Sequence, residues 1–371
     1  MKKKTVVLLS LAAAIALCTA WIASSGTDEP LPSERTVRTS SEARTGEDEP
    51  SEFSESSPAP SASAANEASR VEPAAVSGQA TAPSGQAIGY ASPLNIPLRL
   101  SANYGELRGG HFHAGIDIKT QGVIGKPVFA MADGYVSRVS LGAYGYGRAV
   151  YLTLHNGTTA VYGHLQRFRK DIEERVREER HARRSNSVNL WFGPDTWPVK
   201  QGDVIGYSGN SGSSMGPHLH YELRDTRTQR LYNVVSAGII RPHDDLPPRI
   251  MRIHYIEVDT VQGIPVHSRP ESYAVVRSAG GNYRLTREEP VGAGRKGYFV
   301  VEASDRRNGV GNTFGLWRLA LSADGKPLFE YRMDGFEQAN SRCCDAVSYY
   351  PLQLTSRNEV IRLTQPAGCP D

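Results

Sequence analysis

The chain has 371 residues, of which 39% are apolar, and this is enough for one or two hydrophobic cores. The formal net charge is +3, and three of the positive charges are the lysines that directly follow Met1. Without these lysines the chain is neutral, which excludes nucleic-acid binding driven by a net positive charge.

The first 23 residues have the pattern of an export signal. The three lysines are followed by an uncharged apolar run of 19 residues, from Thr5 to Ala23. This length lies at the border between a cleaved signal peptide and a retained membrane anchor. We therefore expect residues 1–23 to be one of the two. The remainder of the chain is expected to be exported, to the periplasm or the cell envelope.

Residues 24–87 have the composition of a disordered linker. They are rich in Ser, Ala, Glu, Pro and Thr, and Phe53 is their only aromatic residue. Such a segment cannot bury enough apolar surface to offset the entropy lost on ordering. We expect it to act as a flexible tether.

Ordered structure is expected from residue 88, and its first notable segment is His111–Asp117, with the sequence HFHAGID. The glycines in and before this segment argue against a helix. In an extended chain, the even spacing of His113 and Asp117 places both side chains on one side. His111 has the same parity, so spacing alone does not exclude it as a ligand.

A β-hairpin is predicted at Asn156-Gly157, between two short apolar strands. A two-residue turn at this point would pair Leu154 with Thr159. The second strand runs directly into His164. The end of a strand is a common position for a catalytic side chain, so His164 is a candidate.

Residues 167–184 are nearly all charged, with the sequence RFRKDIEERVREERHARR. Glu and Arg residues spaced four apart favour a helix with a solvated surface, and Ile172 and Val176 would anchor it to the protein. Because carboxylates cancel most of the positive charge, the segment does not indicate a nucleic-acid partner. We interpret residues 167–198 as a charged helical insertion.

The stretch Ser208–Leu223, SGNSGSSMGPHLHYEL, brings two more histidines into an apolar segment that is typical of a β-strand. His218 and His220 are two residues apart. Because side chains alternate across a strand, both imidazoles face the same side. Two convergent histidines on a rigid strand indicate a metal site when further ligands are supplied from elsewhere.

A second β-rich unit is predicted from residue 246, where the sequence Leu-Pro-Pro marks a change in composition. Its expected strands have the spacing of a small sandwich: residues 250–258, 273–277 and 298–303, and a hairpin of 317–321 with 328–332. The unit has no repeated cluster of His, Asp or Glu. We interpret it as a packing or binding module.

Cysteine usage agrees with export. Beyond the N-terminal segment the chain has Cys343, Cys344 and Cys369, which allows one disulfide in an oxidising compartment. Neighbouring cysteines rarely pair with each other. We therefore expect a bridge from Cys369 to Cys343 or Cys344.

His113, Asp117 and His220 together offer two imidazoles and one carboxylate, a ligand set that suits Zn²⁺. Three protein ligands leave a fourth position for water, which is typical of a catalytic site. His164 and His218 are then candidates for taking the proton of that water and supporting the negative oxygen that forms.

Three motifs in this order resemble the lysostaphin-type, LytM-like zinc endopeptidases that cut peptidoglycan peptides: HAGID at 113–117, YGHL at 162–165 and GPHLH at 216–220. The resemblance covers roughly residues 88–245. It implies Zn²⁺ on His113, Asp117 and His220, with His164 and His218 as the catalytic pair. It gives His111 no ligand role.

The resemblance also implies a mainly β fold. The peptidase domain at 88–245 would be antiparallel, with the duplicated hybrid motif of the family, and a small β-sandwich-like domain at 246–371 would follow it. The loop Asn103–Arg108 with the HFHAGID segment, together with this second domain, is similar to the envelope versions of Gram-negative Bacteroidetes-like bacteria.

The sequence thus favours a zinc-dependent endopeptidase acting on stem or cross-link peptides of peptidoglycan, without a nucleic-acid partner. A non-catalytic envelope regulator that binds cell wall or amidases is the alternative. A third hypothesis is a peptidase directed at proteins of competitors or hosts. The presence of all five site residues favours an active enzyme.

Overall fold

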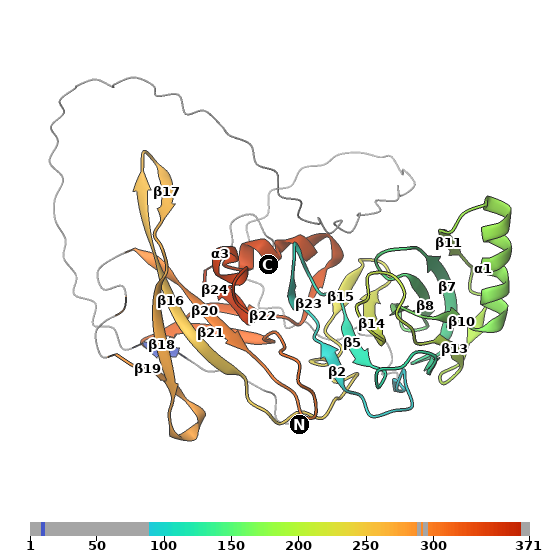
Figure 1. Ribbon diagram of the computed structural model, residues 1–371, viewed down its shortest axis with the longest axis horizontal. Helices are drawn as coiled ribbons and strands as arrows, with labels where there is room; N and C mark the ends of the chain where they lie inside the picture. The colour runs from blue at the N-terminus through green and yellow to red at the C-terminus, as the bar shows by residue number, and fades with distance from the viewer. Residues whose placement is uncertain (1–8, 12–88, 288–290, 292–295, 365–371) are drawn as a thin grey trace, which may run out of the picture. The chain divides into compact units, whose positions relative to one another are not determined.

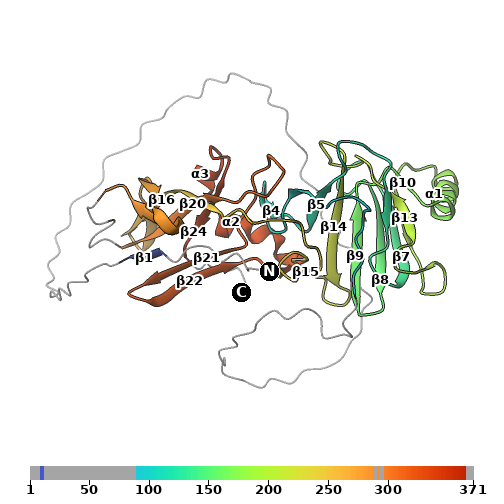
Figure 2. The same ribbon diagram turned by 90° about the horizontal axis from the view of Figure 1, so that it is seen from below.

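The computed structural model describes residues 9–11, 89–287, 291 and 296–364 (Figures 1 and 2). The predicted linker at 24–87 lies outside the described residues, as does most of the predicted export signal. Three residues of that signal form strand β1 (Leu9–Leu11), which pairs in parallel with β21 (Arg318–Ala323). Among the helices of the described ranges, none is both long and apolar enough to cross a membrane.

A ten-stranded sheet forms the centre of residues 89–245, and all its pairings are antiparallel. Its main path runs β11-β7-β8-β9-β14-β15-β23, and Figure 2 shows β14, β9, β8 and β7 as neighbours. In addition, β5 pairs with β14, β2 with β5, and β12 with β7. The strands are β2 (Leu100–Ala102), β5 (Ile116–Lys119), β7 (Gly134–Leu141), β8 (Arg148–Leu154), β9 (Thr158–Gly163), β11 (Val188–Trp191), β12 (Pro198–Val199), β14 (His218–Asp225), β15 (Arg230–Tyr232) and β23 (Gly335–Glu337).

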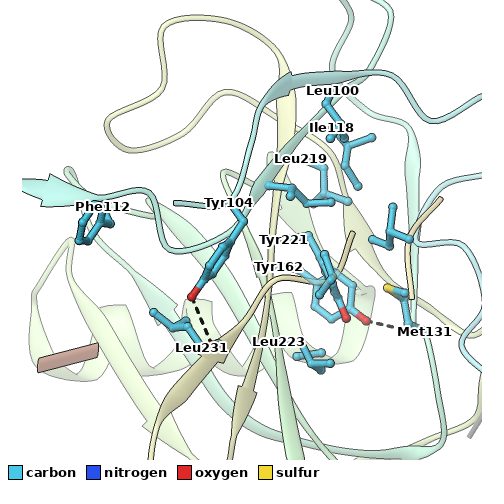
Figure 3. Close-up of a cluster of buried hydrophobic side chains, with 14 of the residues drawn as sticks. Leu100, Tyr104, Phe112, Ile118, Met131, Tyr162, Leu219, Tyr221, Leu223 and Leu231 are labelled. Carbon is cyan, nitrogen blue, oxygen red and sulfur yellow. Dashed lines mark hydrogen bonds between the residues drawn. The ribbon is translucent and has the colours of Figure 1, made fainter. Parts of the chain in front are cut away.

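The core lies on one face of strand β14. Leu219, Tyr221 and Leu223 alternate with the two histidines of this strand and are completely buried (Figure 3). Each buried side chain of this size stabilises the fold by roughly 1.5–3 kcal/mol. Tyr162 of β9 joins the same cluster, and its hydroxyl accepts the Met131 N–H at 3.0 Å. The alternation along β14 therefore separates an apolar core face from a polar face.

The hairpin predicted at Asn156-Gly157 is present, but its predicted register is wrong. Thr153, not Leu154, pairs with Thr159. A two-residue turn needs positive φ at both central residues in type I′ and at the first central residue in type II′. Of this pair only Gly157 has it, at 81°, and the Gly157 N–H donates to the Leu154 carbonyl at 3.2 Å. The turn is therefore longer by one residue, which shifts the pairing.

A small sheet and one helix flank the large sheet. The small sheet has the order β10-β13-β6, made of β10 (Arg167–Phe168), β13 (Val204–Tyr207) and β6 (Pro127–Phe129). The predicted charged helix is confirmed as α1 (Lys170–Arg183), with Ile172 and Val176 buried. After it, β11 and β12 pair with β7. The insertion therefore also contributes strands to the large sheet.

The second β-rich unit is built on a sheet of order β19-β18-β16-β20-β24, with β17 alongside β16, and on the hairpin β21–β22. Ile253, Val301 and Leu321 line one small interior space between sheet and hairpin, as expected for a sandwich-like packing. The strands are β16 (Arg249–Val261), β17 (Ile264–His267), β18 (Glu271–Arg277), β19 (Tyr283–Leu285), β20 (Gly297–Ser304), β22 (Lys326–Arg332) and β24 (Glu359–Arg362). The prediction of a mainly antiparallel β fold is confirmed.

Short helical segments follow β23, and they carry the cysteines. They are η2 (Gln338–Cys343), α2 (Cys344–Val347) and α3 (Tyr350–Gln353). Cys343 is disulfide-bonded, whereas Cys344 has a free, buried thiol. Of the two neighbours, Cys343 is therefore the bridging one; Cys369 lies outside the described residues.

Glu359 of β24 is a buried carboxylate at the centre of the second unit. Its two oxygens accept the N–H groups of Leu107, at 3.1 Å, and Leu316, at 3.0 Å. Burial raises the pKa of the Glu359 carboxyl to about 7, although these two hydrogen bonds act in the opposite direction. Ionisation of Glu359 is therefore less favourable in the folded protein than in the unfolded chain.

We expect Glu359 to make the protein less stable as the pH rises. The folded pKa lies above the unfolded value, so the stabilising contribution is complete below pH 4.5 and is lost as the pH rises through 7. A shift of this size corresponds to a loss of about 3 kcal/mol in the free energy of unfolding. Urea unfolding of the wild type and of Glu359→Gln, at pH 5 to 8, measures the difference in slope.

The exposed Glu337 of β23 provides the control for this measurement. Glu337→Gln should retain the wild-type dependence of stability on pH, whereas Glu359→Gln should flatten it. Parallel curves for Glu359→Gln and the wild type would contradict the assignment.

Candidate metal centre and catalytic groups

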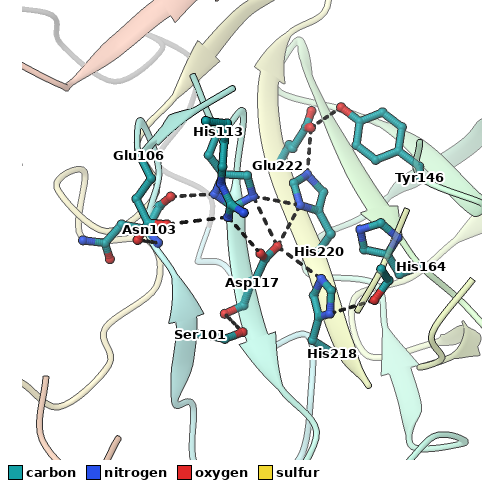
Figure 4. Close-up of polar contacts among 12 residues, drawn as sticks. Ser101, Asn103, Glu106, His113, Asp117, Tyr146, His164, His218, His220 and Glu222 are labelled. Atoms are coloured by element: carbon teal, nitrogen blue, oxygen red, sulfur yellow. Dashed lines mark hydrogen bonds and ion pairs between the residues drawn. The ribbon is translucent and has the colours of Figure 1, made fainter. Parts of the chain in front are cut away.

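The pairing of β14 brings the three predicted motifs together. His220 lies directly opposite Asp117 of β5 on one side and opposite Gly163 of β9 on the other. His164 is the next residue after Gly163. His113 precedes β5 by three residues and reaches the same place (Figure 4). The sheet register therefore collects side chains that are about a hundred residues apart in the sequence.

Three of these side chains present donor atoms at the spacing of a metal site. Asp117 Oδ1 lies 2.9 Å from His220 Nδ1 and 3.3 Å from His113 Nε2, and the two nitrogens are 3.2 Å apart. Tetrahedral Zn²⁺ with bonds of about 2.0–2.1 Å needs donors roughly 3.3 Å apart. The three residues are buried, and the spacing of their donor atoms fits the predicted ion. His111, which spacing alone left open, does not belong to this group.

The charges of this cluster are strongly coupled. Burial opposes ionisation of Asp117, but His113, His218 and His220 outweigh it and hold the pKa of the carboxyl well below its usual range. Burial likewise lowers the pKa of His220, but hydrogen bonds to Asp117 and Glu222 raise it to about 9. A cation binds only to the neutral imidazole, so a metal competes with this proton for Nδ1.

The ring of His113 is oriented by the main chain. Its Nδ1–H donates to the Asn103 carbonyl at 2.6 Å. A carbonyl oxygen can only accept, so the proton resides on Nδ1 and the lone pair of Nε2 points toward Asp117. Asn103 thereby determines which nitrogen of His113 is available to a metal.

A buried carboxylate orients His220 in the same way. His220 Nε2 lies 2.8 Å from Glu222 Oε1 and donates to it, which leaves Nδ1 for a metal. Glu222 is completely buried and also accepts from Arg224 Nε, at 2.6 Å, and from the Tyr146 hydroxyl. Burial raises the pKa of Glu222, but Arg224 and His220 outweigh it and lower the value far below normal. The network keeps Glu222 ionised.

Sequence reasoning did not identify Glu222, Arg224 or Tyr146 as part of the site. For the first two, a signal was present. Along β14, residues 218, 220, 222 and 224 have the same parity, so all four side chains lie on one face of the strand. Tyr146 lies in a loop, and its contact with Glu222 depends on the tertiary structure.

The predicted catalytic pair lies beside the three donor atoms. The rings of His164 and His218 are 4.7 Å apart, and His218 Nε2 is 3.5 Å from Asp117 Oδ1 (Figure 4). His164 Nδ1–H donates to the Ser211 carbonyl and His218 Nδ1–H to the Gly216 carbonyl, both at 2.8 Å. Both rings therefore carry their proton on the side away from the site.

His164 has two further properties of a functional residue. Its backbone is in the left-handed region, with φ at 58°, which is strained for a residue other than glycine. Burial, together with the nearby His220 and His218, lowers the pKa of His164 to about 3. At neutral pH the ring is therefore uncharged, and Nε2 is a free acceptor.

The chain matches a known protein family in this region. The model of Peptidase family M23 matches residues 111–181 and 195–232. The unmatched residues 182–194 fall in the insertion, from the last two residues of α1 through β11. All five predicted site residues lie within the matched segments.

Three curated proteins show the same similarity. The chain is 36% identical over 112 residues to the DD-carboxypeptidase/endopeptidase Mpg of Neisseria meningitidis serogroup B, a match that covers 30% of this chain and 20% of that protein. It is 32% identical over 127 residues to the peptidoglycan DD-endopeptidase ShyC of Vibrio cholerae, covering 34% and 23%. It is 29% identical over 117 residues to the glycyl-glycine endopeptidase ALE-1 of Staphylococcus capitis, covering 31% and 25%.

These matches span about a fifth to a quarter of the length of the curated relatives. Among solved structures, the catalytic domain of the prophage-encoded M23 protein EnpA from Enterococcus faecalis is 30% identical, with 37% of this chain and 87% of that chain covered and a TM-score of 0.28. The part of the chain between residues 111 and 232, which contains all the matched motifs, is therefore similar to Peptidase family M23.

Proposed function

We propose that this protein is a zinc-dependent endopeptidase that hydrolyses peptide bonds in the stem or cross-link peptides of peptidoglycan. The observation that carries the proposal is the triangle of donor atoms from His113, Asp117 and His220, at 2.9–3.3 Å, with two further imidazoles beside it. The family match supports a metallopeptidase. The names of two relatives, a peptidoglycan DD-endopeptidase and a glycyl-glycine endopeptidase, support the substrate.

The chain's own groups divide the chemistry between them. A zinc ion held by the three ligands would polarise a peptide carbonyl and make water more acidic. His164 carries its proton on Nδ1, so the lone pair of its Nε2 is available to take a proton. His218, whose ring lies 4.7 Å from that of His164, would support the negative charge that develops on the substrate oxygen when its Nε2 also carries a proton. Both rings are held by carbonyl acceptors and need little reorganisation.

The regulator hypothesis, in which the protein binds cell wall or amidases without catalysis, requires no intact metal site. The complete and buried set of ligands, in which each histidine has its own hydrogen-bond partner outside the set, favours the enzyme. Export to the periplasm or cell envelope, with residues 1–23 either cleaved or retained as a membrane anchor, would place the enzyme at its substrate. Peptidoglycan is thus the substrate class that agrees with both the proposed activity and the proposed export of the protein.

Removal of a ligand should abolish metal binding. We expect one zinc per chain for the wild type after dialysis, and less than a tenth of that for His220→Ala, because two remaining ligands do not hold the ion. Metal content measured by mass spectrometry, together with circular dichroism as a test of folding, checks this. The matched control is His111→Ala, a neighbouring histidine outside the group, which should retain zinc.

Loss of His164 should separate metal binding from catalysis. We expect His164→Ala to keep its zinc and to release muropeptides from purified sacculi roughly 100- to 10,000-fold more slowly, because a proton-transfer group is lost. Mass spectrometry of the released muropeptides gives both the rate and the bond that is cut. His155→Ala, at the exposed hairpin, is the control. Full activity of His164→Ala with intact zinc would contradict the role given to His164, whereas a zinc-loaded wild type that releases no muropeptides would favour the regulator hypothesis.

The buried carboxylate behind His220 should determine the affinity for metal. Glu222→Gln replaces an acceptor by a group that can also donate, so His220 loses the partner that keeps its proton on Nε2. We expect the dissociation constant for zinc to rise by about 10- to 100-fold, measured by competition with a chromophoric chelator. An unchanged constant in a folded variant would show that Glu222 serves the stability of the fold alone.

A further inference from the structure

The loop Asn103–Arg108, here called the support loop, holds the metal ligand His113 at three points. The Asn103 carbonyl accepts from His113 Nδ1 at 2.6 Å. The His113 N–H donates to the Glu106 carbonyl at 2.9 Å, and the Gly105 N–H donates to the His113 carbonyl at 2.8 Å. The ring and both main-chain groups of His113 are therefore placed by this loop. Any shift of the loop moves the ligand.

The C-terminal part of the chain holds the other side of the support loop. Asn103 Nδ2 donates to the Gly315 carbonyl at 3.2 Å, and Arg307 Nε donates to Asn103 Oδ1 at 3.1 Å. The Leu107 N–H donates to the buried carboxylate of Glu359 at 3.1 Å. Asn103 itself is buried. Its carbonyl thus serves the metal ligand, while its side chain is bound entirely by C-terminal groups.

Apolar packing strengthens the same connection. The Phe336 ring lies 5.2 Å from Tyr104 of the support loop and 5.5 Å from Phe112, the residue before His113. The Phe336 N–H donates to the Tyr104 hydroxyl, which donates in turn to the Leu231 carbonyl. Gly105 has a φ of 74°, and a Cβ there would meet the side chain of Met333 at 2.6 Å. The loop is therefore packed closely against the C-terminal part, with no space for a side chain at Gly105.

We propose that Arg307 and Asn103 are positioning residues through which the C-terminal part of the chain orients the metal ligand His113. The C-terminal unit, which sequence analysis interpreted as a packing or binding module, is on this view a component of the metal centre. Strand β23 extends the sheet that carries the site, because it pairs with β15 in the register Leu231 to Phe336. The inference rests on the proposed metal site and adds a set of residues outside the segments matched by the family model.

The substitutions that test this leave the metal ligands unchanged. Asn103→Ala keeps the carbonyl that accepts from His113 and removes only the side chain held by Gly315 and Arg307. Arg307→Lys keeps the positive charge beside Asp244, 3.4 Å away, but loses the Nε that donates to Asn103. The matched control is Arg306→Lys, because Arg306 is the exposed arginine directly before Arg307 in the chain.

The experiment is a titration of the full chain with Co²⁺, whose absorption spectrum reports the geometry of its ligands, followed by zinc competition. We expect the dissociation constants of Asn103→Ala and Arg307→Lys to rise by about 10- to 100-fold, with an altered cobalt spectrum, and those of Arg306→Lys to remain at the wild-type value. A role in fold stability alone would lower the melting temperature without changing the spectrum or the affinity.

Wild-type affinity and spectrum in the two folded variants would overturn the inference while leaving the proposed metal site intact. If Asn103→Ala does not fold, Arg307→Lys decides alone, because it is the milder change. Failure of the wild type to bind cobalt or zinc would overturn the proposed metal site itself. The two failures are therefore distinguishable in a single set of titrations.

Discussion

The register of strand β14 is the constraint on which the rest of the site depends. His220 is opposite Asp117 on one neighbouring strand and opposite Gly163 on the other, so one pairing pattern sets the distances among the proposed ligands and the two histidines proposed to be catalytic. The intervening residues Leu219 and Tyr221 are buried in the core. A shift of one residue would exchange the two faces, placing imidazoles in the core and apolar side chains in the site. Core packing and site geometry are thus maintained by the same interaction.

A second common feature is that each histidine of the site donates one N–H to a group that can only accept. The partners are the carbonyl oxygens of Asn103, Ser211 and Gly216, and the carboxylate of Glu222. Each hydrogen bond fixes the tautomer and leaves the other nitrogen facing the site. The nitrogen that is left differs: Nε2 for His113, but Nδ1 for His220. Hydrogen-bond partners outside the proposed ligand set therefore determine which ring nitrogen of each histidine faces the metal site.

The division of the chain into a catalytic and an accessory part is less sharp than composition suggested. The predicted boundary at residue 246 falls between β15 and β16, yet β23 returns to pair with β15. Arg307, Gly315 and Glu359 bind the support loop, which in turn holds His113. A unit without a repeated cluster of histidines or carboxylates is thus connected to the proposed metal site through hydrogen bonds to one loop.

The sequence by itself predicted the mainly β class and the charged helix, and it supplied the five candidate site residues, whose roles stay predictions. Parity along a strand places His218 and His220 on one face, and charge spacing specifies a helix around Ile172 and Val176. The register of the Asn156-Gly157 hairpin, the contact of Tyr146 with Glu222 and the support of Asn103 by Arg307 were decided only in the tertiary structure. Each depends on backbone angles or on partners up to two hundred residues away, and neither leaves a periodic trace in the sequence.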